Sequence, residues 1–148
     1  MVVLRFHIHG RGDCMIDRPL YLDKIMPFVD TPFVKILTGV RRCGKSTILK
    51  MIIKKLREEK HVDDEQILSY RFDSMEYEDM TTKELYLELK SKILQDKKMY
   101  LFLDEIHRLP PEGQEMIFYF MDTGTFNRLG ETKRERTASV LIIGATTE

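Results

Sequence analysis

Residues 33–47, with the sequence FVKILTGVRRCGKST, join a short apolar run to a loop that contains two glycines. The β-branched run from Phe33 to Leu37 ends near Gly39, which predicts a buried strand. Gly39–Ser46 fits the pattern G-x-x-x-x-G-K-[ST] without a mismatch, and residues 46–60 place their apolar side chains on one helical stripe. A strand, a loop of this pattern and a helix, in that order, predict a phosphate-binding loop.

The residue types of this loop suit the binding of a phosphate chain. Gly39 and Gly44 permit backbone angles and a close approach that a Cβ would block. Successive amide N–H groups then face an anion at the positive end of the helix. Lys45 would reach the β- and γ-phosphates, Ser46 would offer its hydroxyl to Mg²⁺, and Thr47 either contacts a phosphate or caps the helix. The residues expected to line the nucleotide are Gly39, Val40, Arg41, Arg42, Cys43, Gly44, Lys45, Ser46 and Thr47.

The rest of the chain alternates helical and strand patterns. Apolar side chains recur at helical spacing over residues 20–29, 81–94 and 111–124, and further strands are expected over residues 67–72, 99–103 and 140–144. Residues 1–15 are expected to be an irregular segment. This order predicts an α/β fold, a three-layer P-loop NTPase core in which helices cover both faces of a mostly parallel sheet of about four strands.

Polar residues follow two of the expected strands. Asp104 and Glu105 come directly after an apolar run, and parallel strands would bring them to the same sheet edge as the phosphate loop. Asp104 would hold Mg²⁺ through its water, and Glu105 would orient or deprotonate the attacking water. Thr146 or Thr147, at the end of the last strand, is the candidate for sensing the γ-phosphate. His107 is a catalytic base in one interpretation and a structural histidine in the one we favour.

Composition limits the class of protein further. The chain has 148 residues, enough for one domain, and its 24 Lys and Arg balance its 24 Asp and Glu. Zero formal charge argues against a dominant polyanion-binding surface. The two cysteines do not suggest a disulfide framework or a zinc site, and no apolar run approaches the ~20 residues of a membrane span. The first residues lack the apolar stretch of a signal peptide, so a cytoplasmic protein with no membrane partner is expected.

These motifs together resemble the AAA+ class of P-loop ATPases. Residues 16–106 resemble bacterial and archaeal AAA ATPases of the type that often carries a DUF4143 nuclease-like tail, through RPLYL (18–22), LTGVRRCGKST (37–47) and LFLDEI (101–106). Residues 101–148 are very similar to sigma-54-dependent transcriptional activators of the levanase-operon-regulator type. Between Lys45 and Asp104 the chain has no GAFTGA loop, the element by which such activators engage the sigma factor.

The resemblance implies a Mg²⁺-dependent ATPase that works as a homo-oligomer. It selects ATP as the nucleotide, and the chain has no Asn-Lys-x-Asp guanine motif. Residues 16–148 would form a partial AAA+ core that has no lid domain and no fifth core strand, which leaves the phosphate-loop strand at an open edge of the sheet. The alternatives are an ATPase-domain fragment of a sigma-54-dependent regulator, with a sigma factor or nucleic acid as partner, and a nucleotide-binding core that does not hydrolyse ATP. A natural fusion, a fragment and an engineered chimera are all open interpretations of the two resemblances.

Overall fold

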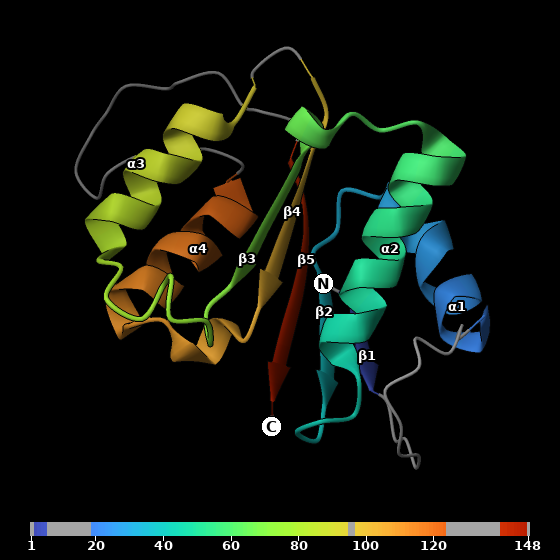
Figure 1. Ribbon diagram of the computed structural model, residues 1–148, viewed down its shortest axis with the longest axis horizontal. Helices are drawn as coiled ribbons and strands as arrows, with labels where there is room; N and C mark the ends of the chain where they lie inside the picture. Colours follow the sequence, from blue (N-terminus) through green and yellow to red (C-terminus); the bar gives the residue numbers. More distant parts are fainter. Residues whose placement is uncertain (1, 6–18, 95–96, 124–139, 148) are drawn as a thin grey trace.

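The computed structural model describes residues 2–5, 19–94, 97–123 and 140–147 (Figure 1). Within these ranges all the strands run parallel in one sheet, with the order β1-β2-β5-β4-β3. The strands are β1 (Val2–Arg5), β2 (Lys35–Gly39), β3 (Ile67–Arg71), β4 (Met99–Asp104) and β5 (Val140–Thr147). The helices are α1 (Pro19–Val29), α2 (Lys45–Lys60), α3 (Thr82–Lys92) and α4 (Pro111–Thr123), with short 3-10 helices η1 (Asp64–Gln66) and η2 (Ile106–Arg108).

The sheet is the middle of three layers. Helices α1 and α2 cover one face, and α3 and α4 cover the other (Figure 1). Each face has its own apolar cluster, and alternate residues of β4 contribute to the two, Phe102 to the α1–α2 side and Leu101 and Leu103 to the α3–α4 side. Strand β4 is therefore buried along its whole length. The predicted α/β class, the parallel sheet and the helices on both faces are confirmed.

The local signals that predicted the helices are also found in the structure. Helix α3 begins at the predicted capping box, in which the backbone N–H of Glu84 donates to Oγ1 of Thr81 and the backbone N–H of Thr81 donates to Oε2 of Glu84. Helix α4 begins at Pro111, in the first turn where a missing N–H costs nothing. No helix within the described ranges is long and apolar enough to cross a membrane.

Strand β1 is the main departure from the expected fold. Residues 2–5 lie within the segment that the sequence predicted to be irregular, yet they pair in parallel with β2, Val2 opposite Lys35 and Arg5 opposite Thr38. The phosphate-loop strand thus has a neighbour on each side, β1 and β5. The expectation of an open edge at this strand is wrong. Its pairing partner comes from the start of the chain.

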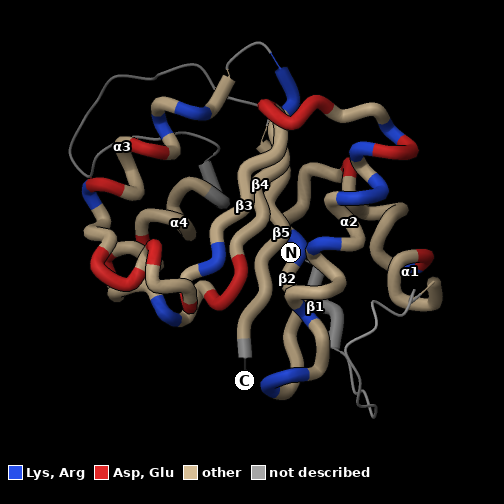
Figure 2. Tube along the Cα trace, viewed as in Figure 1, with Lys and Arg blue, Asp and Glu red and all other residues tan. Residues whose placement is uncertain are grey.

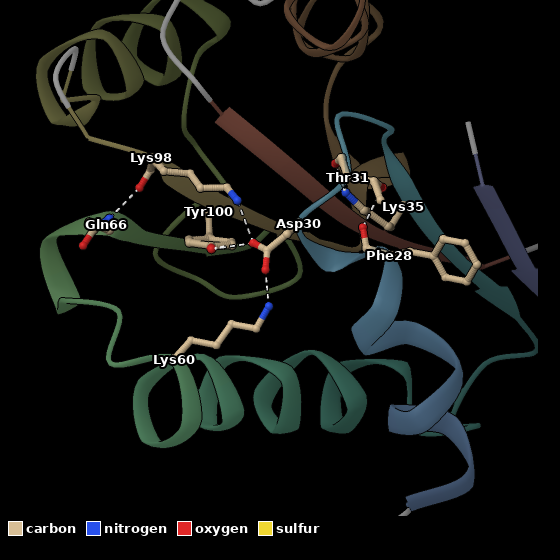
Figure 3. A network of polar contacts seen from close by, with 8 residues as sticks. All are labelled: Phe28, Asp30, Thr31, Lys35, Lys60, Gln66, Lys98 and Tyr100. Atoms are coloured by element: carbon tan, nitrogen blue, oxygen red, sulfur yellow. Dashed lines mark hydrogen bonds and ion pairs between the residues drawn. The ribbon is translucent and has the colours of Figure 1, made fainter.

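A polar network links three elements at the end of the sheet away from the phosphate loop (Figure 3). Asp30, just after α1, accepts hydrogen bonds from Lys60 of α2, from Nζ of Lys98 at 2.8 Å and from the hydroxyl of Tyr100 at 2.8 Å. Burial raises the pKa of Asp30, but these hydrogen bonds outweigh burial and hold it well below its usual value. The network joins α1, α2 and β4, which is a structural role.

Strand β2 also contains a buried lysine at the same end of the sheet. Nζ of Lys35 donates to the main-chain carbonyl of Thr31 at 2.5 Å, and the side chain is fully buried (Figure 3). Burial lowers the pKa of Lys35 to about 8, because the charged ammonium is poorly solvated there.

Candidate nucleotide-binding site

The loop between β2 and α2 has the backbone geometry that its glycines predicted. Gly39 has a φ of 153°, and Gly44, the residue before α2, has a φ of 93°. Residues that carry a Cβ rarely adopt these backbone conformations. Arg42 is also left-handed, with a φ of 64°. The backbone N–H of Cys43 donates to the carbonyl of Val40 at 3.3 Å and closes the turn. The chain therefore curls back at the N-terminus of α2, where the helix dipole favours an anion.

Lys45 lies inside this loop. Its side chain is only 4% exposed, and Nζ donates to the carbonyls of Gly39 at 2.9 Å and Val40 at 3.1 Å. Nζ also lies 3.9 Å from Sγ of Cys43. A buried ammonium is costly unless a partner compensates its charge. The loop thus holds a desolvated positive charge at its centre, where a phosphate group would neutralise it.

The other residues predicted to line the nucleotide fall into two groups. Val40, Arg41 and Arg42 are exposed at the tip of the loop, and Figure 2 shows basic residues at this tip. Ser46 and Thr47 are half-buried in the first turn of α2. The residue at the helix cap is Gly44 and no side chain caps the helix, so the structure does not support the capping role considered for Thr47.

The end of β4 and the loop after β2 lie at the same edge of the sheet (Figure 1). Asp104 ends β4 and pairs with Ala145 of β5, while Gly39 ends β2 and pairs with Thr147 of β5. Strand β5 separates the two, and a spacing of about 4.8 Å between neighbouring strands places β2 and β4 about 10 Å apart. The structure therefore brings the phosphate loop, the two acidic residues and the end of β5 to one edge of the sheet, as expected for parallel strands.

Asp104 has the character of a metal ligand. It is 5% exposed, and its Oδ1 has no hydrogen-bond partner among the residues that the structure describes. A buried carboxylate oxygen without a partner is costly in the absence of a cation. Mg²⁺ prefers hard oxygen ligands and is commonly held by one or two carboxylates together with substrate phosphates. The donor set of Asp104 and Ser46 fits that ion.

Glu105 contacts His107, the residue for which the sequence favours a structural role. Oε2 of Glu105 lies 3.3 Å from Nε2 of His107, and Nδ1 of the same imidazole lies 3.4 Å from Oγ1 of Thr146. Glu105 and Thr146 are 41 positions apart in the sequence, but one histidine connects them. The only sequence signal for this chain of contacts is the position of His107 two residues after Glu105.

Arg71 is a further charged residue at this edge that the sequence did not single out. It ends β3 as the register partner of Asp104, and it forms an ion pair with Asp73, Nε to Oδ1 at 2.7 Å. Hydrogen bonding to Asp73 raises the pKa of Arg71, and the negative charges of Asp104 and Glu105 raise it further. Arg71 thus lies close enough to Asp104 and Glu105 to interact with their charges.

The fold and the site define the class of protein. The chain has a three-layer α/β fold around a parallel sheet. A G-x-x-x-x-G-K-[ST] loop follows one strand, and two acidic residues stand at the end of another. This is the fold of the P-loop NTPases. The model of the AAA domain family matches residues 31–131, and the chain belongs to this family.

Two relatives match different lengths of the chain. The transcriptional regulatory protein LevR of Bacillus subtilis is 71% identical over 48 residues, which are 32% of this chain and 5% of LevR. An uncharacterized protein of Haemophilus influenzae is 34% identical over 94 residues, 62% of this chain and 23% of that protein. The chain thus spans a small part of the length of each relative. The resemblance to AAA+ ATPases and to regulators of the LevR kind is confirmed.

A solved structure shares the fold. The crystal structure of NtrX from Brucella abortus in complex with ATP has a TM-score of 0.58 and 20% sequence identity. The match covers 96% of this chain and 30% of the NtrX chain. At this level of identity the similarity is one of fold.

Proposed function

We propose that the chain binds Mg-ATP in the loop between β2 and α2 and hydrolyses it. The observation that carries this proposal is the buried ammonium of Lys45, which is hydrogen-bonded to Gly39 and Val40 inside a loop of the phosphate-binding pattern. Bound phosphates would replace these carbonyls as partners of Lys45. ATP is the proposed nucleotide because the family resemblance implies it and because the NtrX structure of the same fold contains ATP.

Each residue at the edge then has a distinct task. Lys45 and the loop amides hold the β- and γ-phosphates, and Ser46 and Asp104 hold Mg²⁺. When bound, the ion neutralises charge on the phosphate oxygens. Glu105 orients a water for attack on the γ-phosphorus and accepts its proton, as the bond from that phosphorus to the bridging oxygen breaks. Thr146 or Thr147 contacts the γ-phosphate, and the products are ADP and inorganic phosphate.

The oligomeric state and the cellular location of the chain are part of the same proposal. We expect activity to need a homo-oligomer, because the resemblance implies that a neighbouring subunit completes the site. We also expect the chain to act in the cytoplasm.

A second candidate function rests on the similarity to LevR. Identity of 71% over 48 residues favours a piece of the ATPase domain of a transcriptional regulator. A pull-down with purified sigma-54 tests this: capture that requires Mg-ATP supports the regulatory role, and equal recovery with and without nucleotide counts against it. A core that binds ATP without hydrolysing it is the third candidate.

Substitution Glu105→Gln separates binding from hydrolysis. The amide keeps the shape of the side chain but cannot accept the proton of the attacking water. We expect phosphate release to fall at least hundredfold while the affinity for Mg-ATP changes little. Phosphate release and calorimetric titration measure the two properties. Glu115→Gln, at an exposed position of α4, is the matched control and should behave like the parent chain. A parent chain that releases no phosphate at any protein concentration contradicts hydrolysis.

A further inference from the structure

The turn after β4 is fixed against β5 by a close contact. A Cβ on Gly144 would lie 2.7 Å from Cδ1 of Ile106, the first residue of η2, so the side chain of Ile106 packs directly against the backbone of Gly144. Gly144 and Thr146 are two residues apart in β5 and therefore lie on the same face of the sheet. Ile106 packs against Gly144, and His107, the next residue of the turn, contacts Thr146. Packing thus determines where the imidazole lies.

The backbone of Glu105 is held in an uncommon conformation at the start of this turn. Its φ is 57° and its ψ is 44°, the left-handed region that residues with a Cβ seldom adopt. The backbone N–H of Arg108 donates to the carbonyl of Glu105 at 2.9 Å and helps to maintain the turn. Backbone strain of this kind is concentrated at functional sites. The backbone of this turn and the contact with His107 together determine where the carboxylate of Glu105 lies.

The two contacts of His107 constrain its hydrogen atoms. A carboxylate accepts hydrogen bonds only, so Nε2, which lies 3.3 Å from Oε2 of Glu105, can act there only as a donor. The hydroxyl of Thr146 can donate to Nδ1 or accept from it. Glu105, His107 and Thr146 form one polar chain. If the hydroxyl of Thr146 moves, the imidazole of His107 loses its contact with Thr146, and the same imidazole contacts Glu105.

We propose that His107 is a positioning residue whose imidazole holds the carboxylate of Glu105 and the hydroxyl of Thr146 in place relative to each other. The inference rests on the proposed function, in which Glu105 orients the water and one of two threonines contacts the γ-phosphate, and it assigns that contact to Thr146. His107 itself touches neither the nucleotide nor the water. When the γ-phosphate contacts Thr146, the imidazole of His107 moves, and the carboxylate of Glu105 moves with it. The carboxylate thus reaches its working orientation only when a triphosphate is bound.

A double-mutant cycle of His107→Ala and Thr146→Val tests this coupling in the full chain. Each single substitution breaks the same polar chain, so we expect each to lower kcat about tenfold with KM changed less than about threefold. The double variant should be no slower than the slower single variant, because the chain is already broken. A purely structural role of His107 would give no such coupling to Thr146.

Two additional variants keep the test clear. His107→Gln has an amide that donates and accepts, and it should recover most of the lost kcat. His61→Asn changes an exposed histidine at the far end of α2, about 24 Å from the loop by helix length, and should match the parent. Unfolding midpoints of all variants show whether the fold is kept.

The affinity ratio of Mg-ATP to Mg-ADP gives a readout that does not need hydrolysis. Thr146→Val also removes the proposed direct contact with the γ-phosphate, so it should lower this preference more than His107→Ala does, and the double variant should lower it no further than Thr146→Val alone. Multiplicative losses in the double variant, with a parent that binds and hydrolyses Mg-ATP, overturn the role of His107 and leave the proposed function intact. A parent chain that binds no nucleotide overturns both.

Discussion

At the scale of single residues, the site is built from groups that are costly without a ligand. The ammonium of Lys45 is buried against main-chain carbonyls, and one carboxylate oxygen of Asp104 is buried without a partner among the described residues. Burying a charged group is costly unless its partners compensate the charge. In the proposed function, phosphates and Mg²⁺ would supply counter-charges to these two groups. We therefore expect ligand binding to stabilise the fold.

Asp104→Asn separates these two effects. The amide removes the buried charge at nearly constant shape, so we expect the unfolding midpoint without nucleotide to stay equal or rise. The affinity for ATP with Mg²⁺ should fall at least tenfold, while the affinity measured with EDTA stays near that of the parent. Thermal unfolding and calorimetry give the two values, with the exposed Asp79→Asn as control. An unchanged response to Mg²⁺ in Asp104→Asn argues against its role as a ligand.

At the scale of elements, the sequence predicted more of the helices and strands than of the contacts between them. The glycine loop, the capping box at Thr81 and the apolar run before Asp104 are local signals, and each element that they predicted is present. The contacts of His107 were not predictable, because they depend on how η2 packs against β5. Ile106 and Gly144 meet in that packing, and they are 38 positions apart in the sequence. The structural role favoured for His107 from the sequence stays a prediction.

The contact between Ile106 and Gly144 leads to a prediction about this turn. Gly144→Ala places a methyl group against Cδ1 of Ile106, so we expect a loss of about 1–2 kcal/mol in the free energy of unfolding. Catalysis should fall as well, because the turn carries Glu105 and His107. Ile106→Val removes Cδ1, so the double variant should resemble Ile106→Val alone in thermal unfolding and phosphate release. If Gly144→Ala costs as much in the Ile106→Val background as in the parent, the close contact is not the cause.

At the scale of the whole molecule, β1 changes the expected architecture. Four residues with no strong local signal become a strand because the edge of β2 offers them unpaired backbone groups. A pairing of this kind depends on the assembled sheet, so the pattern of residues 1–15 alone did not reveal it. The rest of the architecture followed from the alternation of helices and strands, since parallel strands need helical crossovers.

Removal of residues 1–5 tests the importance of this edge. Loss of the β1 ladder should lower the free energy of unfolding by about 1–3 kcal/mol and expose the edge of β2. We therefore expect a lower unfolding midpoint and association that increases with protein concentration. Thermal unfolding and light scattering at two concentrations measure both effects. A truncated chain with the midpoint and the scattering of the full chain would show that β1 contributes nothing to the sheet.

The central claim is that the loop around Lys45 binds the phosphates of Mg-ATP, and one calorimetric titration tests it directly. Mg-ATP is titrated into the parent chain and into Lys45→Ala, after circular dichroism has shown that both are folded. We expect saturable binding in the parent and a loss of at least hundredfold in affinity in Lys45→Ala. Equal binding in the two chains, or no binding in a folded parent, would contradict it.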